Sequence, residues 1–412
     1  MIRSMYAAVS GLRSHQTMMD VVGNNIANVN TNGFKKSNVI FQDILSQTLN
    51  GASAPTDSLG GTNAAQIGLG VQLSNISQNF AQGALQTTGR DLDLSIQGDG
   101  FFNLEQDGVQ LYGRSGSFYV DANGNLVGGN GGYVQGWEAD PTGAVNNTGP
   151  AGRISIPAGE QVAPVITSEV NLGGNLPAES EIGDQHFTSL DVYDGQGATV
   201  ELAVTFTKTN DDEWTLSATY GEAATDIPLT DNVLTFDTTG RIVTPADFGA
   251  DVAAGGIPGL GDIVLTIGGD NPGEITQLAA LGSIAAITQD GSATGQLSGL
   301  TVGEDGIITG SYSNGQVKSL AQVAIASFAN PEGLERVTGT MFKTSVNSGL
   351  AQLGAAASGG RGIIAPGTLE MSNVDLAEEF TNLIRTQRGF QANSRVITTS
   401  DEMLQEIVNL KR

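Results

Sequence analysis

Apolar residues recur at every seventh position at both ends of this chain. Near the N-terminus, residues 2–30 carry one such column, and the column beside it is mixed in polarity. The two columns alternate in steps of three and four, the spacing that places side chains on one stripe of an α-helix. The sequence therefore predicts a helix that ends before Gly33, a residue suited to a left-handed cap. The apolar column consists of Met5, Leu12, Met19 and Ile26.

The C-terminal end repeats this design with a longer column. No proline follows Pro366, so a continuous helix is predicted from about Asn373 onward, with Asn373 or Ser372 as its N-cap. The neighbouring column begins with Phe380 and is half polar. The apolar column consists of Leu376, Leu383, Phe390, Ile397 and Leu404.

Two heptad stripes at opposite ends of one chain favour pairing of the ends as a two-helix coiled coil. The alternative is that each stripe belongs to an ordinary amphipathic helix lying on a globular core. Pairing is favoured because the spacing holds over four or five repeats. The mixed second columns indicate a weak pair, so we expect both ends to be disordered in a monomer and ordered by neighbouring copies. The apolar columns and Phe380 are the predicted polymerisation core.

The middle of the chain is predicted to be β-structure. The 57 glycines and the low charged fraction of 15% favour tight turns and short strands. Residues 200–207 alternate in polarity with a period of two, and residues 121–125 form a hairpin turn signal between two short apolar runs. The predicted fold class is mainly β with α-helical termini. The termini pair as a coiled coil, and an outer all-β domain is inserted into an inner one.

The predicted domains follow these shifts in composition. They are an N-terminal core helix at 1–33, a connecting segment at 34–90, the first half of the inner β domain at 91–145, the inserted outer β domain at 146–289, the second half of the inner domain at 290–340, a connecting segment at 341–371 and a C-terminal core helix at 372–412.

The charge distribution excludes some classes of function. The net charge is −25, and acidic residues dominate the middle of the chain. A basic groove for nucleic acid is therefore not expected, because phosphate contacts need clustered lysines and arginines. Since the chain has no cysteine, disulfides and thiolate chemistry are excluded. No window reaches the roughly 18 apolar residues of a membrane span, and the first residues lack a signal-peptide pattern, so membrane insertion and a cleaved signal peptide are not expected.

The search for chemistry predicts no catalytic residue, no cofactor and no metal site. His15 and His186 stand outside any recognisable motif. Residues 121–125 resemble a fragment of a calcium loop, but the distal glutamate is missing. Three acidic residues at 211–213 crowd like charges into a turn without further support for paired-carboxylate catalysis. An enzyme is not predicted.

Residues 10–12, 20–28 and 31–35 form an N-terminal motif. This motif resembles the signature of the flagellar axial proteins, a family that includes rod, hook and hook-associated proteins. Near the C-terminus, residues 367–376 and 387–393 also resemble that family. Together the two matches are highly specific for the family. The residues that carry the N-terminal signature are Gly11, Asp20, Gly23, Asn24, Asn25, Ile26, Asn28, Gly33 and Phe34.

Within the family, the middle of the chain is most similar to hook proteins. The resemblance rests on residues 192–197, 212–214, 312–315 and 328–334. Rod proteins typically lack a large outer insertion, whereas this chain devotes 146–289 to one. The resemblance is patchier across 220–290.

This resemblance implies a function, partners and a location. Hook subunits assemble into a curved tube that acts as a universal joint between motor and filament, with terminal helices lining an export channel. The implied partners are other copies of the chain, a distal rod protein, a hook cap, a hook–filament junction protein, a hook-length control protein and the flagellar type III export apparatus. The implied location is the extracellular hook. The alternatives are a distal rod subunit and, in a different class, a secreted β-rich binding module.

Overall fold

The chain divides into an inner and an outer unit. The computed structural model describes residues 2–55, 60–156, 159, 161–221, 225–229, 232–244, 249–252, 263–267 and 275–410. The inner unit comprises Met1–Pro157, Leu300–Thr309 and Ser319–Arg412, and the outer unit comprises Ala158–Gly299 and Gly310–Lys318. The sequence of the outer unit thus lies inside that of the inner unit, as the nested architecture predicts. The domain limits at 146 and 289 stay a prediction.

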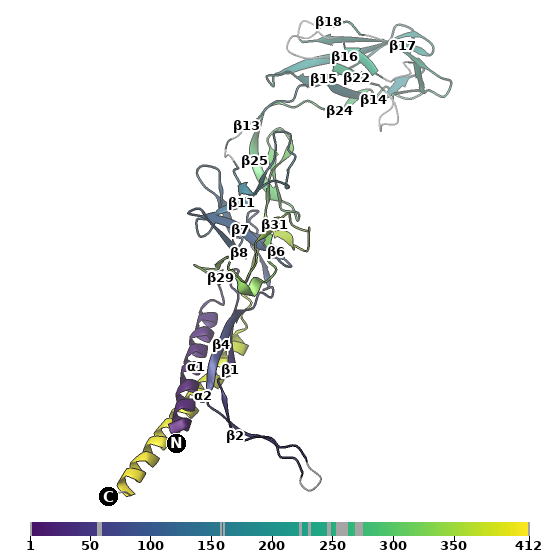
Figure 1. Cartoon of the computed structure of the whole chain (residues 1–412). Coiled ribbons are helices and arrows are strands. Elements are labelled where there is room, and N and C mark those ends of the chain that lie inside the picture. Colours follow the sequence, from purple (N-terminus) through teal and green to yellow (C-terminus); the bar gives the residue numbers. More distant parts are fainter. Residues whose placement is uncertain are drawn as a thin grey trace. The chain divides into compact units, whose positions relative to one another are not determined.

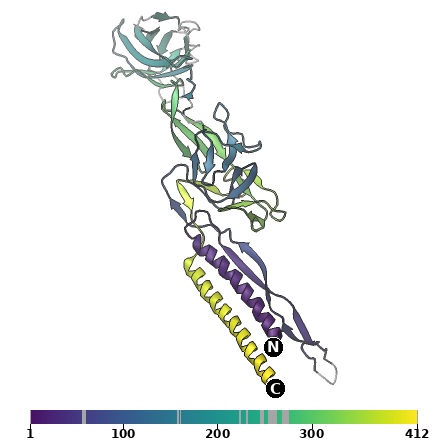
Figure 2. The same cartoon turned by 90° about the vertical axis from the view of Figure 1, so that its left-hand side faces the viewer.

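Two long helices occupy the ends of the chain, as predicted. Helix α1 spans Ile2–Ala27 and α2 spans Leu376–Leu410. They run antiparallel and side by side within the inner unit (Figures 1 and 2). Within the described residues, no helix is long and apolar enough to cross a membrane.

Segment 34–90, predicted as a connecting segment, is organised into strands. The longest pair joins β1 and β4 in antiparallel register from Ser37 opposite Gln78 to Asp43 opposite Val71. Both strands contact α1 (Figure 1). Each of them carries exposed apolar residues, such as Ile40 on β1 and Leu73 on β4. The strands of this segment are β1 Ser37–Asp43, β2 Ser46–Asn50, β3 Ala65–Gly68, β4 Val71–Gln78 and β5 Leu85–Thr87.

The β part of the inner unit is a sheet whose paired strands contribute aromatic side chains to a buried cluster. In its main sheet β11, β7, β8, β30 and β29 are neighbours in that order, and β28 also pairs with β7. Phe101, Tyr112 and Phe342 meet in one buried cluster. The elements are β6 Leu94–Gln97, β7 Phe101–Gln106, β8 Val109–Gly113, β9 Phe118–Val120, β10 Leu126–Gly128, β11 Tyr133–Glu138, β12 Gly152–Arg153, β28 Ile325–Ser327, η1 Pro331–Gly333, β29 Glu335–Arg336, β30 Met341–Lys343, β31 Gln352–Gly354, β32 Ile363–Pro366 and β33 Thr368–Glu370. Three strands run across the unit limits: β25 Gly295–Val302, β26 Ile307–Tyr312 and β27 Val317–Val323.

The outer unit encloses one core between two sheets. One sheet has the order β15-β16-β17-β19-β20, and the other has the order β21-β22-β14-β23. Val204 of β16, Trp214 of β17 and Leu172 of β14 belong to the same buried cluster, so the sheets pack face to face. The predicted alternation at 200–207 appears as alternating burial along β16. The strands are β13 Gln161–Val162, β14 Glu169–Pro177, β15 Gln185–Tyr193, β16 Thr199–Asn210, β17 Glu213–Tyr220, β18 Thr225–Ile227, β19 Val233–Phe236, β20 Ile242–Thr244, β21 Gly249–Val252, β22 Ile263–Thr266, β23 Ile275–Leu278 and β24 Ala285–Gln289.

Aspartates close several hairpin turns through their own side chains. The Asp121 carboxylate accepts hydrogen bonds from the backbone N–H groups of Asn123 and Asn125, each at 2.8 Å. The Asp140 carboxylate accepts from the backbone N–H groups of Thr142 at 2.9 Å and Ala144 at 3.0 Å. The calcium-like pattern at 121–125 is therefore explained by turn chemistry.

We expect the Asp140 turn to lose stability in acid. Hydrogen bonds from the Thr142 hydroxyl and the Ala144 backbone lower the pKa of Asp140 below its ordinary value of 3.8. Because the pKa is lower in the folded state, the stabilisation is present above the unfolded pKa and is lost as pH falls through the folded one. A carboxyl-carbon NMR titration should give an Asp140 midpoint below 3.8. A midpoint at or above 3.8 would contradict this account, and Asp140→Asn, which keeps the acceptor oxygen, identifies the resonance.

Candidate assembly site

The seam between α1 and α2 is filled by small and polar side chains. Gly11 lies opposite Asn393, and His15 lies opposite Gly389. Farther along, the Asn25 Nδ2 atom donates a hydrogen bond to Glu379 Oε2 at 3.2 Å. These contacts fix one antiparallel register with heptad spacing on both helices. The buried seam residues are Ala8, Gly11, Ser14, Val22 and Asn25 of α1 and Glu379, Thr386 and Ser400 of α2.

The predicted apolar columns flank this seam and are only partly covered within one chain. Leu376 is 41% exposed and Phe380 is 50% exposed. The remaining members are half-buried: Met5, Leu12, Met19, Ile26, Leu383, Phe390, Ile397 and Leu404. The two columns therefore do lie on the same helix pair. The centre of the seam, however, is occupied by the small and polar residues named above.

Glycine at two positions allows the helices to approach closely. A Cβ atom on Gly389 would lie 2.6 Å from the His15 ring, and one on Gly11 would lie 2.6 Å from Asn393 Nδ2. Both distances are shorter than van der Waals contact. By contrast, a Cβ on Gly23 of α1 would meet no atom within 4 Å.

We expect alanine to have opposite effects at two of these helical glycines. Gly23→Ala should stabilise α1 by about 0.5–1 kcal/mol, because alanine has the higher helix propensity. Gly389→Ala should destabilise the helix pair, because its Cβ meets the His15 ring. Thermal unfolding followed by circular dichroism at 222 nm measures both. Equal changes in unfolding temperature for the two variants would contradict the close approach of the helices at Gly389.

A buried ionic cluster ties the end of α1 to the inner β structure. The Lys35 Nζ atom donates to Glu370 Oε1 at 2.6 Å and to the carbonyl of Ala81 at 2.8 Å. The Glu370 Oε1 atom also accepts from the backbone N–H of Gly83 at 2.8 Å. Arg114 Nη1 lies 3.6 Å from Glu370 Oε2 as an ion pair. One carboxylate thus faces two cations, and all three side chains are buried.

Burial of the cluster disfavours the charged form of Lys35. Desolvation lowers the pKa of the Lys35 ammonium from its ordinary value, and the adjacent Glu370 carboxylate counteracts that shift. Removing the partner of a buried charge leaves that charge uncompensated in the low-dielectric interior, which is strongly destabilising. Glu370 is therefore the residue on which the cluster depends.

Comparison with known proteins extends these findings. The model of the family "Flagella basal body rod protein" matches residues 5–35, and "Flagellar basal body rod FlgEFG protein C-terminal" matches 365–410. "Flagellar hook protein FlgE/F/G D1 domain" matches 95–174, and "Flagellar basal body protein FlaE D2 domain" matches 174–292. The flagellar hook protein FlgE of Borreliella burgdorferi is 39% identical over the full length of both chains. The chain belongs to the flagellar hook protein family.

Two further similarities bear on the hook-family assignment. The flagellar basal-body rod protein FlgG of Bacillus subtilis is 32% identical, again over the full length of both chains. A crystal structure of the Helicobacter pylori flagellar hook protein FlgE2 is 15% identical and covers 69% of this chain and 100% of that chain, with a TM-score of 0.52. The latter supports the fold. A structural role in the flagellum follows from membership of the hook family.

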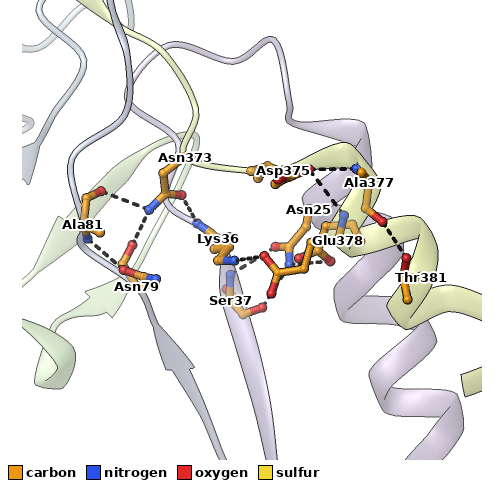
Figure 3. A network of polar contacts seen from close by, with 12 residues as sticks. Asn25, Lys36, Ser37, Asn79, Ala81, Asn373, Asp375, Ala377, Glu378 and Thr381 are labelled. Atoms are coloured by element: carbon orange, nitrogen blue, oxygen red, sulfur yellow. Dashed lines mark hydrogen bonds and ion pairs between the residues drawn. The ribbon is translucent and has the colours of Figure 1, made fainter. Parts of the chain in front are cut away.

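A network of asparagines organises the start of α2 (Figure 3). The Asn373 Oδ1 atom accepts from the Lys36 backbone N–H at 2.8 Å, and its Nδ2 atom donates to the carbonyls of Asn79 and Ala81. The Asp375 carboxylate accepts from the Ala377 N–H at 2.8 Å. Asp375 is thus the N-cap of α2, and the predicted cap at Asn373 or Ser372 is wrong. The Asn373 side chain cannot cap α2, because it is hydrogen-bonded to the backbone of Lys36, Asn79 and Ala81.

The signature residues of the flagellar axial family lie in several different places on the inner unit. Asn25 exchanges two hydrogen bonds with the backbone of Ser37, Gly33 has a positive φ of 70°, and Phe34 is buried beneath the Arg336 guanidinium. These three residues fix the turn after α1. Asn24 and Asn28 share the last turn of α1 through a hydrogen bond from Asn28 Nδ2 to the Asn24 carbonyl. Asp20 and Gly23 are exposed on α1, whereas Gly11 is buried and Ile26 is half-buried on the helix pair.

Several residues of the site had no predicted role. Lys35 directly follows Phe34 of the N-terminal signature, and Glu370 lies in the C-terminal range 367–376. Because the two are so distant along the chain, neither motif reveals that they form a pair. The small residues Ala8 and Val22 do repeat at heptad spacing. Their column includes His15 and is less apolar than its neighbour, so it is a weaker signal of burial. Among the described residues, no group of three or more acidic, histidine or cysteine side chains is arranged to hold a metal ion.

Proposed function

We propose that this hook-family chain polymerises into the curved tubular hook, a flexible joint that transmits torque from rod to filament around a central export channel. The observation that carries this proposal is the exposure of large apolar side chains on a helix pair whose own seam is small and polar. Phe380 and Met403 are each about half exposed, and Val408 is 68% exposed. Burying such side chains is worth roughly 1.5–3 kcal/mol each, which favours contact with neighbouring copies.

Membership of the family also supports the proposed partners and location. We expect copies to travel unfolded through the flagellar type III export apparatus, without a cleaved signal peptide, and to assemble outside the cell beneath a hook cap. A distal rod protein and a hook–filament junction protein would contact the two ends of the tube, and a hook-length control protein would limit its growth. Such a polymer requires a heterologous contact that does not close. No catalytic activity is proposed.

A distal rod subunit is the second candidate, and the full-length similarity to a rod protein is what favours it. The two functions differ in the shape of the polymer. A rod is straight and stiff, whereas a hook is curved and bends.

We expect the outer domain to govern curvature and not assembly. Removal of residues 146–289, the predicted insertion, should leave α1, α2 and the ionic cluster intact, because their partners lie outside that range. The shortened chain should therefore still polymerise, but into short or straight polymers when viewed by negative-stain electron microscopy. Complete loss of assembly, with the inner unit still folded by circular dichroism, would count against this division of roles.

A further inference from the structure

A groove in the inner unit lies between α1 and the strands that follow it. One wall is a stripe of α1 that includes Tyr6, Val9 and Thr17, and the other includes Leu69 and Val71 at the β3–β4 turn. The groove encloses about 470 Å³. Its apolar side chains are partly open to solvent, with Tyr6 71% exposed. A surface of this kind accepts the apolar stripe of a helix.

The α1 wall of the groove carries one positive charge. Arg13 lies on the same stripe of α1 as Tyr6 and is exposed. Among the described residues it has no ion-pair partner within the chain. An occupant that combines apolar anchors with adjacent carboxylates would match both features of the groove.

The last three turns of α2 carry that combination. Met403 and Ile407 are four residues apart on one face and are each about half exposed. Glu402 and Glu406 form a parallel acidic column beside them and are exposed. In the register of the helix pair, Ile2 of α1 lies opposite Glu402, so the apolar pair extends past the described part of α1.

We infer that the groove of one copy binds the C-terminal turns of α2 from a second copy. Met403 and Ile407 enter the groove, and Glu402 or Glu406 pairs with Arg13. The contact joins two different surfaces of the same chain, so it propagates instead of closing. The inference rests on the proposed function and names the contact through which it acts.

The occupant cannot be the same copy of α2. The register that sets His15 opposite Gly389 also sets Thr17 opposite Gln387. Met403 is then about 24 Å farther along α2, at 1.5 Å per residue. A bond between positions 17 and 403 therefore reports contact between copies.

The absence of cysteine from the chain allows a direct test. Thr17→Cys protein is mixed with size-tagged Met403→Cys protein, polymerised and oxidised, and the mixed dimer is measured by non-reducing electrophoresis. The matched control mixes Asp20→Cys protein with the same Met403→Cys protein. Asp20 is exposed on α1 but does not line the groove. A further mixture pairs Thr17→Cys with Phe187→Cys, an exposed residue of the outer unit.

A mixed dimer is expected for positions 17 and 403. No mixed dimer is expected for positions 20 and 403 or for positions 17 and 187. Polymer without that dimer would overturn this inference and leave the proposed function standing. A dimer formed with position 187 instead would assign the groove to the outer unit and also overturn it. Failure of the unmodified chain to polymerise would overturn both.

Charge exchange provides a second measurement. Arg13→Glu should raise the critical concentration for polymerisation about tenfold, equivalent to one lost charge pair. Adding Glu402→Lys and Glu406→Lys to the same chain should restore it. If the charge-exchanged chain polymerises no better than Arg13→Glu alone, Arg13 does not face these carboxylates.

Discussion

Phe390→Asp is expected to abolish polymerisation while leaving both β units folded. Phe390 lies in the apolar column of α2 and is only half-buried within one chain, so its exposed part is available to a neighbouring copy. A carboxylate at that position loses the benefit of burial and adds the cost of desolvating a charge at every repeat of the contact. Sedimentation of polymer measures the loss, and near-ultraviolet circular dichroism checks the β units.

The neighbouring residue provides the control for this prediction. Gln391 is exposed on α2, so Gln391→Asp introduces the same charge outside the apolar column. It should polymerise at nearly the concentration of the unmodified chain. Normal tubes from Phe390→Asp would show that the column does not hold the polymer together.

Glu370→Ala should lower the free energy of unfolding of the inner unit by about 3–5 kcal/mol, because it leaves Lys35 and Arg114 as buried charges without their carboxylate. The two tryptophans allow the units to be followed separately. Trp137 lies in the inner unit and Trp214 in the outer unit. In a Trp214→Phe background, tryptophan fluorescence during urea unfolding therefore reports the inner unit alone.

An exposed ion pair in the same unit is the matched control. Lys343 Nζ lies 3.2 Å from Glu335 Oε2, and both side chains are about half exposed. Glu335→Ala should cost no more than about 1 kcal/mol. Equal costs for Glu335→Ala and Glu370→Ala would mean that the buried cluster does not hold the inner unit together.

The sequence predicts the helices well because periodicity is a local signal. Seven-residue columns locate α1 and α2, and alternation locates β16. The turn at 121–125 appears between β9 and β10 as expected. Each of these features depends on neighbours within a few residues, so one sequence is enough to reveal it.

The partner of each helical face could not be predicted in the same way. An apolar column shows that a face is buried somewhere, but it does not distinguish burial within a chain from burial between copies. The seam uses Gly11, Thr386 and Ser400 because close backbone approach needs small side chains. The strands of 34–90 were also missed, since their exposed apolar residues are interspersed with Ser, Asn and Gln.

Polar contacts between residues far apart along the chain could not be predicted from the sequence for a different reason. Lys35 and Glu370 meet only after the whole β structure has folded between them. Nothing in the local spacing of either residue encodes that distance. Asp375 replaced the predicted cap because Asn373 is engaged by Lys36 and Asn79.

Negative-stain electron microscopy of the purified, unmodified chain under polymerising salt tests the central claim most directly. Hollow, curved tubes are expected, because the exposed helix faces drive association and the full outer unit is present. Straight tubes would contradict the hook function and favour the rod. Monomers that persist at every concentration would contradict self-assembly itself.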